Sequence, residues 1–581
     1  MLAVQMIYMM SNCVGKNNDA AETNLNPAEQ PEGEDQMSKS DSILQLSNIN
    51  WPPEQALPGF PVPAEKLYSM DTAFLTPDER ITISALQGIA NKTEPRLLLT
   101  EDGDIPRDTW AKTFNLHTVT VKEQYDLIAK FKDEVRGIVV YDPSKSSHYR
   151  NIASSVANIN GYLPVTNGIK KTLARYGVEF DEADIIDITG WTLTSPIDIY
   201  GKFYDEYWRE CTKRLLISAN PDRDFDHCRD IAAAVGAAVV YLDCKKSDER
   251  ALYEKFMYDM AGNRDKNNTT AIVMGWFTSE RSGITAGSAY GVSSIPADLY
   301  ISGSVYGGVT YNKNPEDRTI NIPAVPPKNG PENKVYVAVF MTDGDNIQYI
   351  QRFMRKLWDS PEETASRGKV AVNWTISPSL VDIGPGILNY YYSLATEKEC
   401  FVAGPSGMGY LMPVNTNRED GVRLGEFLTD KTYMDAYTKL TERYLQKAGL
   451  RVVTIWDDAN GDLRDSYERN CRYLYGATVQ NFGAGNVSSG ITNGRLAFIK
   501  HETHYEGQYH TILADMTKKI SAWDGEKPLF LTYQVKVWEC GTPQIVKLFD
   551  ELDKKFEGKV EFVRADHFFA LYNEANGLPF N

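Results

Sequence analysis

Continuous apolar runs, rich in Val and Ile, alternate with helical segments along most of this chain. Examples are Gly137–Tyr141 (GIVVY), Leu215–Ser218 (LLIS), Ala238–Leu242 (AVVYL) and Ala271–Trp276 (AIVMGW). In such a run both faces of the strand are apolar, which is typical of a parallel sheet that helices cover on both sides. The alternation therefore predicts an α/β protein built on parallel sheets.

Two of the helical segments begin with the same pair of residues. In Thr76-Pro77 and Ser195-Pro196 the hydroxyl can cap the helix, and proline fits the first helical turn. Helices are expected over Pro77–Asn91, Pro196–Arg214, Asp226–Val235 and Glu249–Gly262. With the strands between them, these helices predict two or three small α/β domains within residues 49–325.

A proline-rich segment, Ile322–Pro331 (IPAVPPKNGP), ends this region and precedes a part of different character. The 249 residues from 333 to 581 match the usual size of a (β/α)₈ barrel, about 250 residues. Eight candidate strands follow one another there: Val335–Met341, Lys369–Trp374, Cys400–Val402, Arg451–Ile455, Ala477–Gln480, Leu496–Ile499, Pro528–Tyr533 and Val560–Val563. We therefore expect residues 326–581 to form a (β/α)₈-like barrel of the TIM type; a distorted barrel with seven strands fits the same pattern.

Acidic side chains gather directly after the predicted barrel strands, where such barrels place their active sites. Glycoside hydrolysis needs two carboxyl groups that flank the scissile bond. The carboxylates at the predicted rim are Asp343, Asp345, Asp457, Asp458, Glu502, Glu539 and Asp566, and our catalytic candidates are Asp343, Asp345, Asp458, Glu502 and Glu539. Each one alone could be a helix cap or a salt-bridge partner, so the argument rests on their clustering.

A glycine-rich run, Gly407–Pro413 (GMGYLMP), follows the third predicted strand. It resembles the G-x-G-Y-x-Y-P signature of the GxGYxYP family of putative glycoside hydrolases, with Met412 where tyrosine is usual. The resemblance implies a barrel-like C-terminal domain, preceded by small α/β domains, that acts on a glycan. It supplies no catalytic residues, so the carboxylate candidates rest on the residues alone.

Several side chains near the predicted rim could bind an oligo- or polysaccharide. Glycine lets the backbone approach a ligand closely, and aromatic rings stack on the apolar faces of sugars. The substrate-binding candidates are Trp374, Gly407, Gly409, Tyr410, Trp456, Trp538, Asp566 and His567. For the glycine-rich run, a tight turn around a buried Tyr410 is an equally plain interpretation.

Two other functions fit the same residues. A divalent metal held by Asp343, Asp345, His501 and His504 would indicate a metal-dependent glycan deacetylase or hydrolase. A pocket with aromatic rings but no working carboxylate pair would indicate a non-catalytic glycan-binding envelope lipoprotein. The glycosidase hypothesis needs no cofactor, and we find no nucleotide-binding motif.

The first 48 residues differ from the rest in composition. A short apolar run, Leu2–Met10, is followed by Cys13 and then by a polar, acidic stretch. This order resembles a bacterial lipoprotein signal and predicts a lipidated Cys13, a disordered tether, and export to the periplasm or the outer cell envelope. A disordered cytoplasmic tail with an incidental cysteine is the alternative.

Charge and hydropathy exclude two further classes of protein. The chain carries 61 Lys and Arg against 78 Asp and Glu, a net charge of −17, and an acidic surface repels nucleic-acid backbones. No apolar stretch is long enough to span a membrane, so a lipid anchor is the one membrane attachment that we expect.

Overall fold

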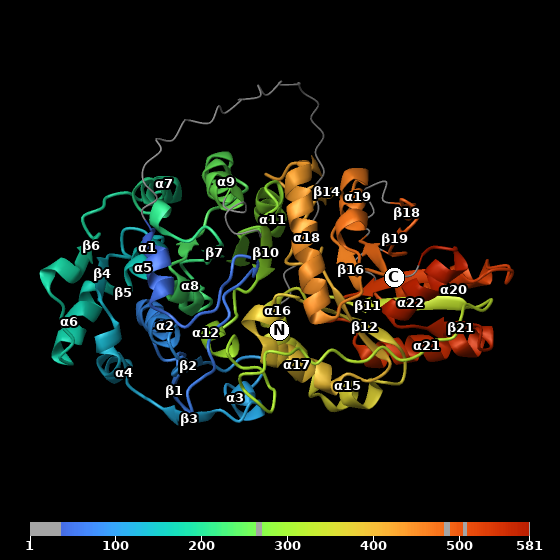
Figure 1. Cartoon of the computed structure of the whole chain (residues 1–581), viewed down its shortest axis with the longest axis horizontal. Helices are drawn as coiled ribbons and strands as arrows, with labels where there is room; N and C mark the ends of the chain where they lie inside the picture. Colours follow the sequence, from blue (N-terminus) through green and yellow to red (C-terminus); the bar gives the residue numbers. More distant parts are fainter. Residues whose placement is uncertain (1–36, 263–269, 481–487, 504–507, 580–581) are drawn as a thin grey trace, which may run out of the picture. The chain divides into compact units, whose positions relative to one another are not determined.

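The computed structural model describes residues 37–262, 270–480, 488–503 and 508–579 (Figure 1). Cys13 and His504 lie outside these residues, so lipidation of Cys13 and a metal-binding role for His504 stay predictions. Within the described ranges, no helix has both the length and the apolar composition needed to cross a membrane.

The N-terminal region contains three parallel sheets, in the orders β2-β1-β3, β5-β4-β6 and β10-β9-β7-β8. The strands are β1 (Lys66–Asp71), β2 (Leu97–Thr100), β3 (His117–Thr120), β4 (Gly137–Tyr141), β5 (Tyr162–Thr166), β6 (Ile185–Asp187), β7 (Leu215–Ser218), β8 (Ala238–Val240), β9 (Ile272–Gly275) and β10 (Ser293–Pro296). β4, β7, β8 and β9 lie where the apolar runs predict strands, and all of their residues are buried. The prediction of parallel α/β sheets is confirmed.

Helices connect and cover these strands. They are α1 (Lys39–Gln45), α2 (Pro77–Asn91), α3 (Thr109–Thr113), α4 (Gln124–Lys130), α5 (Tyr149–Asn160), α6 (Asn167–Arg175), α7 (Pro196–Glu206), α8 (Arg229–Val235), α9 (Ser247–Gly262), α11 (Glu280–Ser288) and α12 (Gly303–Tyr306). Thr76 and Ser195 cap α2 and α7 as expected. The helix expected from Asp226 begins only at Arg229, because Cys228 adopts a left-handed conformation (φ 56°) and turns the preceding residues away from the helix.

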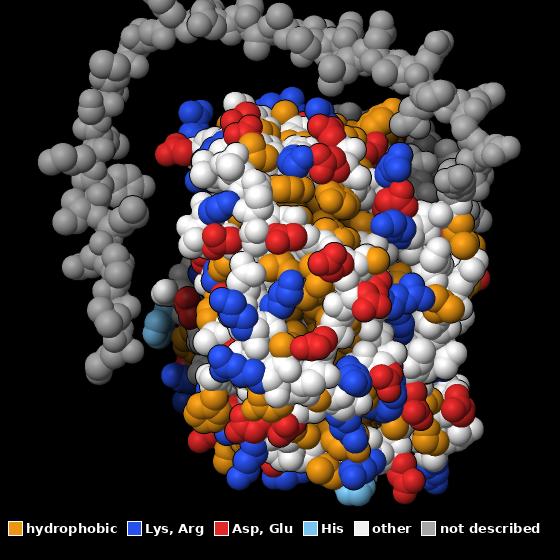
Figure 2. Space-filling model, turned by 90° about the vertical axis from the view of Figure 1, so that its left-hand side faces the viewer, with side chains coloured by type: hydrophobic (Ala, Val, Ile, Leu, Met, Phe, Trp, Pro, Cys, Tyr) orange, Lys and Arg blue, Asp and Glu red, His pale blue; other side chains and the backbone are white. Residues whose placement is uncertain are grey.

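Figure 2 shows the face of the molecule that lies at the left of Figure 1, where α6 and β6 are found. Basic and acidic side chains are interspersed across this face, and apolar side chains lie between them. A nucleic-acid backbone needs a continuous basic surface, and the described residues form none on this face.

The C-terminal region contains a nine-stranded sheet in the order β18-β19-β17-β16-β13-β12-β11-β20, with β21 also paired to β11. Its strands are β11 (Val335–Met341), β12 (Val372–Ile376), β13 (Glu399–Ala403), β16 (Val452–Ile455), β17 (Gly476–Val479), β18 (Gly490–Thr492), β19 (Leu496–Lys500), β20 (Leu529–Val535) and β21 (Val560–Phe562). All eight predicted strands are present and parallel; β18 is an additional antiparallel strand. β14 (Val414–Asn415) and β15 (Gly425–Glu426) form a separate hairpin.

This sheet is curled, but a closed (β/α)₈ barrel is not confirmed. β20 pairs with β11 along its whole length, whereas the other edge of β11 is shared by β21 and β12. No ladder of described residues joins β19 to β20. Beyond the end of β19 the Glu502 amide donates to the carbonyl of Thr532 in the middle of β20 at 2.9 Å, and Thr532 Oγ1 donates to the Lys500 carbonyl at 3.3 Å. The eighth strand therefore lies between the first two instead of closing the circle.

The helices of this region are α13 (Ile347–Gln351), α14 (Phe353–Trp358), α15 (Pro361–Ser366), α16 (Leu380–Ile383), α17 (Pro385–Leu394), α18 (Lys431–Ala448), α19 (Gly461–Asn470), α20 (Tyr509–Ser521), α21 (Thr542–Phe556) and α22 (Ala565–Ala575). The last helix, α22, packs on the sheet. Its Phe568 and Phe569 share an apolar cluster with Tyr336 and Phe340 of β11. A Cβ atom on Gly476 would lie 1.9 Å from the Phe569 ring, so glycine in β17 makes room for this helix.

Candidate active site

Asp343 and Asp345 occupy the turn at the end of β11, as the sequence predicts. Gly344 between them lies against β12, where its amide donates to Thr375 Oγ1 at 2.8 Å. Asp343 is in the left-handed region (φ 70°), a conformation that residues other than glycine adopt at some cost in free energy. Both carboxyl side chains are half-buried. The turn therefore holds two acids close together at the edge of the sheet.

The environment of Asp343 acts on its pKa in two directions. Burial raises the pKa, and hydrogen bonds from Thr342 and Trp538 together with the charge of Lys536 oppose the rise. The Thr342 hydroxyl lies 2.5 Å from Asp343 Oδ2. The net pKa is above that of an exposed aspartate, but these neighbours favour the ionised form.

Asp345 has no comparable support for its charge. Burial holds its pKa well above the usual range, and the negative charges of Asp343 and Glu280 raise it further. The opposing contribution is a hydrogen bond from its own backbone. Of the two acids in the turn, Asp345 is therefore the one that keeps its proton.

Glu280 is a third acid at this position, and the sequence analysis missed it. It is the first residue of α11, which follows β9 in a different sheet. The Tyr410 hydroxyl donates to its Oε1 at 2.6 Å. Burial raises the pKa of Glu280, and the charge of Asp343 adds to the rise, whereas Tyr410 and Arg281 lower it.

The glycine-rich run packs against β10 and so positions Tyr410 beside Glu280. The Ser294 amide donates to the Tyr410 carbonyl at 2.8 Å, so β10 and the run lie edge to edge. A Cβ atom on Gly409 would lie 2.6 Å from Ser293 Oγ, and one on Gly407 would lie 2.5 Å from Thr441 Oγ1. Both glycines also have positive φ. The backbone at Gly407 and Gly409 thus packs closely against Thr441 and Ser293 of the protein itself, not against a ligand. This close packing explains why glycine is needed at both positions.

Most of the expected sugar-stacking rings are buried. Tyr410, Trp374 and Trp456 are only 2%, 1% and 7% exposed. Trp374 donates to Glu399, a buried partner of Arg367, so it belongs to the core. Trp538 is 50% exposed and rests on Phe353, with ring centroids 4.3 Å apart. Among the four expected rings, Trp538 alone presents a face to solvent.

A further ring and a fourth acid border the cluster. Trp276 follows β9 and was not among the predicted substrate-binding residues. It is half-buried, and its ring centroid lies 6.4 Å from that of Tyr410. Asp457 at the end of β16 accepts from Thr416 and lies 3.8 Å from Arg281. Like Asp343, Asp457 has a positive φ (63°). The ends of β11, β13 and β16 and the start of α11 thus meet at one place.

The remaining carboxylates at the strand ends have basic partners. Asp458 lies 3.6 Å from Arg464, Glu502 lies 2.8 Å from Lys519, and Glu539 lies 3.8 Å from Lys536. Burial raises the pKa of Asp458, and Ala459 and Arg464 oppose that rise. The charge of Lys536 also acts on Asp343, so Glu539 borders the Asp343, Asp345 and Glu280 cluster.

Asp566 and His567 do not lie at the expected edge of the sheet. They are in the first turn of α22, and Asp566 is buried in an ion pair with Arg564 at 2.6 Å. Arg564 also donates to the carbonyl of Glu399, the first residue of β13. The imidazole of His567 lies 2.9 Å from the Pro326 carbonyl. The expected position is wrong because β21 turns directly into a helix that packs on the sheet.

The predicted metal ligands are not brought together in the described residues. His501 is buried, and its ring lies 5.1 Å from that of Phe340. Burial lowers the pKa of His501 to about 3. The three-ligand group that the described residues do form is a different one, Glu101, Asp226 and His227.

Comparison with known proteins identifies the family of the C-terminal region. Residues 333–573 match the family described as the GxGYxYP putative glycoside hydrolase C-terminal domain. This part of the chain belongs to the GxGYxYP family. The signature run of the family thus forms the contact between β10 and the C-terminal region. Met412, which replaces the usual tyrosine, is buried in the core.

The GxGYxYP region and the sheets before it also have a counterpart of known structure. A crystal structure of a putative hydrolase from Bacteroides thetaiotaomicron VPI-5482 is similar, with a TM-score of 0.72 and 20% identity. The match covers 92% of this chain and 100% of that one, and at this identity it concerns the fold alone. No curated protein matches the chain in sequence.

Proposed function

We propose that this chain is a glycoside hydrolase in which Asp345 is the general acid and Asp343 its ionised partner. The observation that carries the proposal is the contrast within one turn. Asp345 has a pKa well above the usual range, whereas hydrogen bonds and a lysine favour the charged form of Asp343. Two carboxyl groups with divergent environments are what acid–base cleavage of a glycosidic bond requires.

Glu280 and Tyr410 support this division of roles. The charge of Glu280 adds to that of Asp343 in raising the pKa of Asp345. Tyr410 holds Glu280 in place through a partly buried hydrogen bond. In this mechanism Asp345 protonates the leaving oxygen, and Asp343 acts as nucleophile or as base toward water. Trp538 provides an exposed ring beside Asp343 for one sugar unit of an oligo- or polysaccharide.

The test is the response of Asp345→Asn to the leaving group. A glycan or an alkyl glycoside needs protonation of the departing oxygen, and a dinitrophenyl glycoside does not. We expect turnover of the first kind to fall by about 10²–10⁴-fold and of the second far less. Asp343→Asn should lose both. Asp205→Asn, at an exposed aspartate of α7 in the N-terminal region, is the matched control and should retain activity.

Two results would contradict the proposal. Equal losses of Asp345→Asn on both kinds of substrate would remove the general-acid role. Tight binding of glycans with no product from the unmodified chain would instead favour a glycan-binding protein. Thermal unfolding of each variant separates these results from a loss of fold.

We also propose that Cys13 is lipidated and that the chain is exported to the cell envelope. The proposal rests on the apolar run before Cys13 and the acidic stretch after it. Metabolic labelling with a fatty acid should mark the chain, and Cys13→Ser should abolish the label. A label that persists in that variant would contradict lipidation at this residue.

A further inference from the structure

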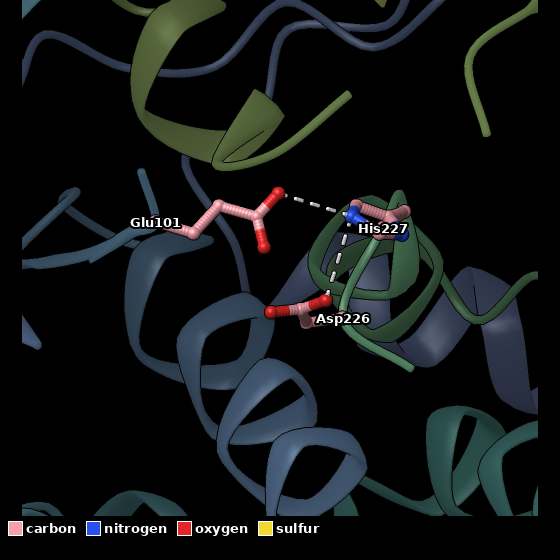
Figure 3. Close-up of side chains that lie close together, drawn as sticks. All are labelled: Glu101, Asp226 and His227. Carbon is pink, nitrogen blue, oxygen red and sulfur yellow. Dashed lines mark ion pairs between the residues drawn. The ribbon is translucent and has the colours of Figure 1, made fainter. Parts of the chain in front are cut away.

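Three side chains from two distant segments converge at the end of β2. Glu101 follows that strand directly, and Asp226 and His227 precede α8 (Figure 3). His227 Nε2 lies 3.5 Å from Glu101 Oε1 and 3.6 Å from Asp226 Oδ1. The close-up shows both carboxyl groups facing this nitrogen.

The imidazole of His227 is buried without a hydrogen bond. The residue is 4% exposed, and neither ring nitrogen has a hydrogen-bond partner among the described residues. Buried polar atoms in native proteins are nearly always satisfied, so an orphaned pair of ring nitrogens indicates a missing partner such as an ion or water. Nε2 faces two carboxylate oxygens, one at the outer limit of hydrogen-bond distance and the other beyond it, and the negative charge of both carboxylates attracts a cation.

The two separations fit the spacing of ligands around a metal ion. Nitrogen and oxygen ligands bind zinc at about 2.0–2.2 Å, which in a tetrahedral site separates neighbouring ligand atoms by about 3.3–3.6 Å. One imidazole and two carboxylates are a usual donor set for such an ion. We infer that Glu101, Asp226 and His227 form a binding site for a divalent transition-metal ion of the zinc type.

Two arginines fix the ligand carboxylates. Arg80 Nη2 lies 2.8 Å from Glu101 Oε2 and 2.8 Å from Asp226 Oδ2, and Arg352 pairs with Glu101 Oε1. Each carboxylate oxygen has two lone pairs, so these contacts orient the ligands and leave acceptor capacity toward the ion. Because the arginines balance both carboxylate charges, the metal-free protein stays folded and the ion binds more weakly than at an uncompensated site.

A small cavity borders Glu101, the proposed ligand at the end of β2. Its volume is about 30 Å³, and Glu101, Arg352, Tyr306 and Gln351 are among the residues that line it. One water molecule needs roughly 10–15 Å³ of such space. The cavity can therefore hold a water molecule beside Glu101, and three protein ligands leave one position of a tetrahedral site for such a molecule.

The site connects parts of the molecule that lie in different sheets. Glu101 belongs to the β2-β1-β3 sheet, and the turn before α8 belongs to the β10-β9-β7-β8 sheet. Arg352 follows α13, whose N-cap, Asn346, is next to Asp345. A bound ion would stabilise the contact between the two N-terminal sheets and, through Arg352, the helix that follows the Asp343–Asp345 turn.

The experiment is calorimetric titration of the full chain with ZnCl₂ after removal of metal by EDTA and gel filtration. We expect one ion per chain and a higher midpoint of thermal unfolding. His227→Asn should weaken binding by more than about ten-fold, because even residues that only orient a ligand have effects of that size. His117→Asn, at an exposed histidine on β3, should leave binding unchanged.

If His227→Asn does not fold, X-ray absorption of the zinc-loaded unmodified chain identifies the ligand atoms instead. The site predicts nitrogen and oxygen ligands only, with a single imidazole. A sulfur ligand, two imidazoles, absence of binding, or unchanged affinity in a folded His227→Asn variant would each overturn the inference. In the last two cases the cluster is an ion-pair network between the sheets.

Discussion

The conformation of the Asp343–Asp345 turn requires glycine at position 344, and replacement of Gly344 by alanine tests this requirement directly. An added Cβ atom would lie 1.6 Å from the Thr375 carbonyl oxygen. Because real Cβ contacts are not shorter than 3.0 Å, the turn and β12 must separate by at least 1.4 Å. The obstructing atom belongs to the backbone of a central strand, so a side-chain rotation cannot relieve the contact.

The expected cost follows from these contacts. Overpacking a well-packed site costs about 1–3 kcal/mol, and loss of the Gly344–Thr375 hydrogen bond costs about 0.5–1.5 kcal/mol. Gly344→Ala should therefore lower the free energy of unfolding by about 1.5–4.5 kcal/mol. A displacement of about 1 Å in catalytic groups reduces turnover by about 10²-fold, so the hydrolytic activity should fall as well.

The assay is urea denaturation together with hydrolysis of an aryl glycoside. Gly201→Ala is the matched control: Gly201 lies inside α7, and a Cβ atom there would meet nothing within 4 Å. This variant should be stabilised by about 0.5–1 kcal/mol. An unfolding free energy of Gly344→Ala within about 0.5 kcal/mol of the unmodified chain, a change typical of neutral surface substitutions, would refute the reasoning.

Two further predictions concern ionisable groups. Tyr410→Phe removes a hydrogen bond that lowers the pKa of Glu280, so the pKa of Glu280 should rise further, with a corresponding shift in the pH profile of hydrolysis; an unchanged profile would separate Glu280 from the reaction. Asp382 is buried, accepts from the Leu57 amide, and has a pKa raised to about 6. The pKa of Asp382 is higher in the folded than in the unfolded chain, so its contribution to the free energy of unfolding is fully present below about pH 4. This contribution, about 3 kcal/mol, is lost as the pH rises through 6. Asp382→Asn should lack this component in urea titrations at pH 4–7, and an identical pH dependence would contradict the assignment.

Local patterns predicted the elements of this fold well. Thr76 and Ser195 cap their helices because the capping hydrogen bond involves residues only three apart. The eight C-terminal strands were found because most of them are short apolar runs separated by helical segments. The pairing of β21 between β11 and β12 was not predictable, because it depends on register between strands far apart in the chain.

The same division applies to the candidate site. Asp343 and Asp345 were identified because a turn after a buried strand must expose its polar residues at the edge of the sheet. Glu280 was missed, because α11 belongs to another sheet and reaches the turn only through the contact between β10 and Tyr410. Trp374 and Trp538 have the same residue type but opposite environments, one 1% and the other 50% exposed.

The sequence by itself thus determined the α/β class, the strands, the helix caps and the acidic turn after β11, since each depends on neighbours within a few residues. Only the tertiary structure decided that the C-terminal sheet curls without closing, that Glu280 joins Asp343 and Asp345, and that Tyr410 is buried. The physical reason is that burial and the charge–charge effects on these pKa values depend on distance in space, and distance in space between remote segments is set by packing.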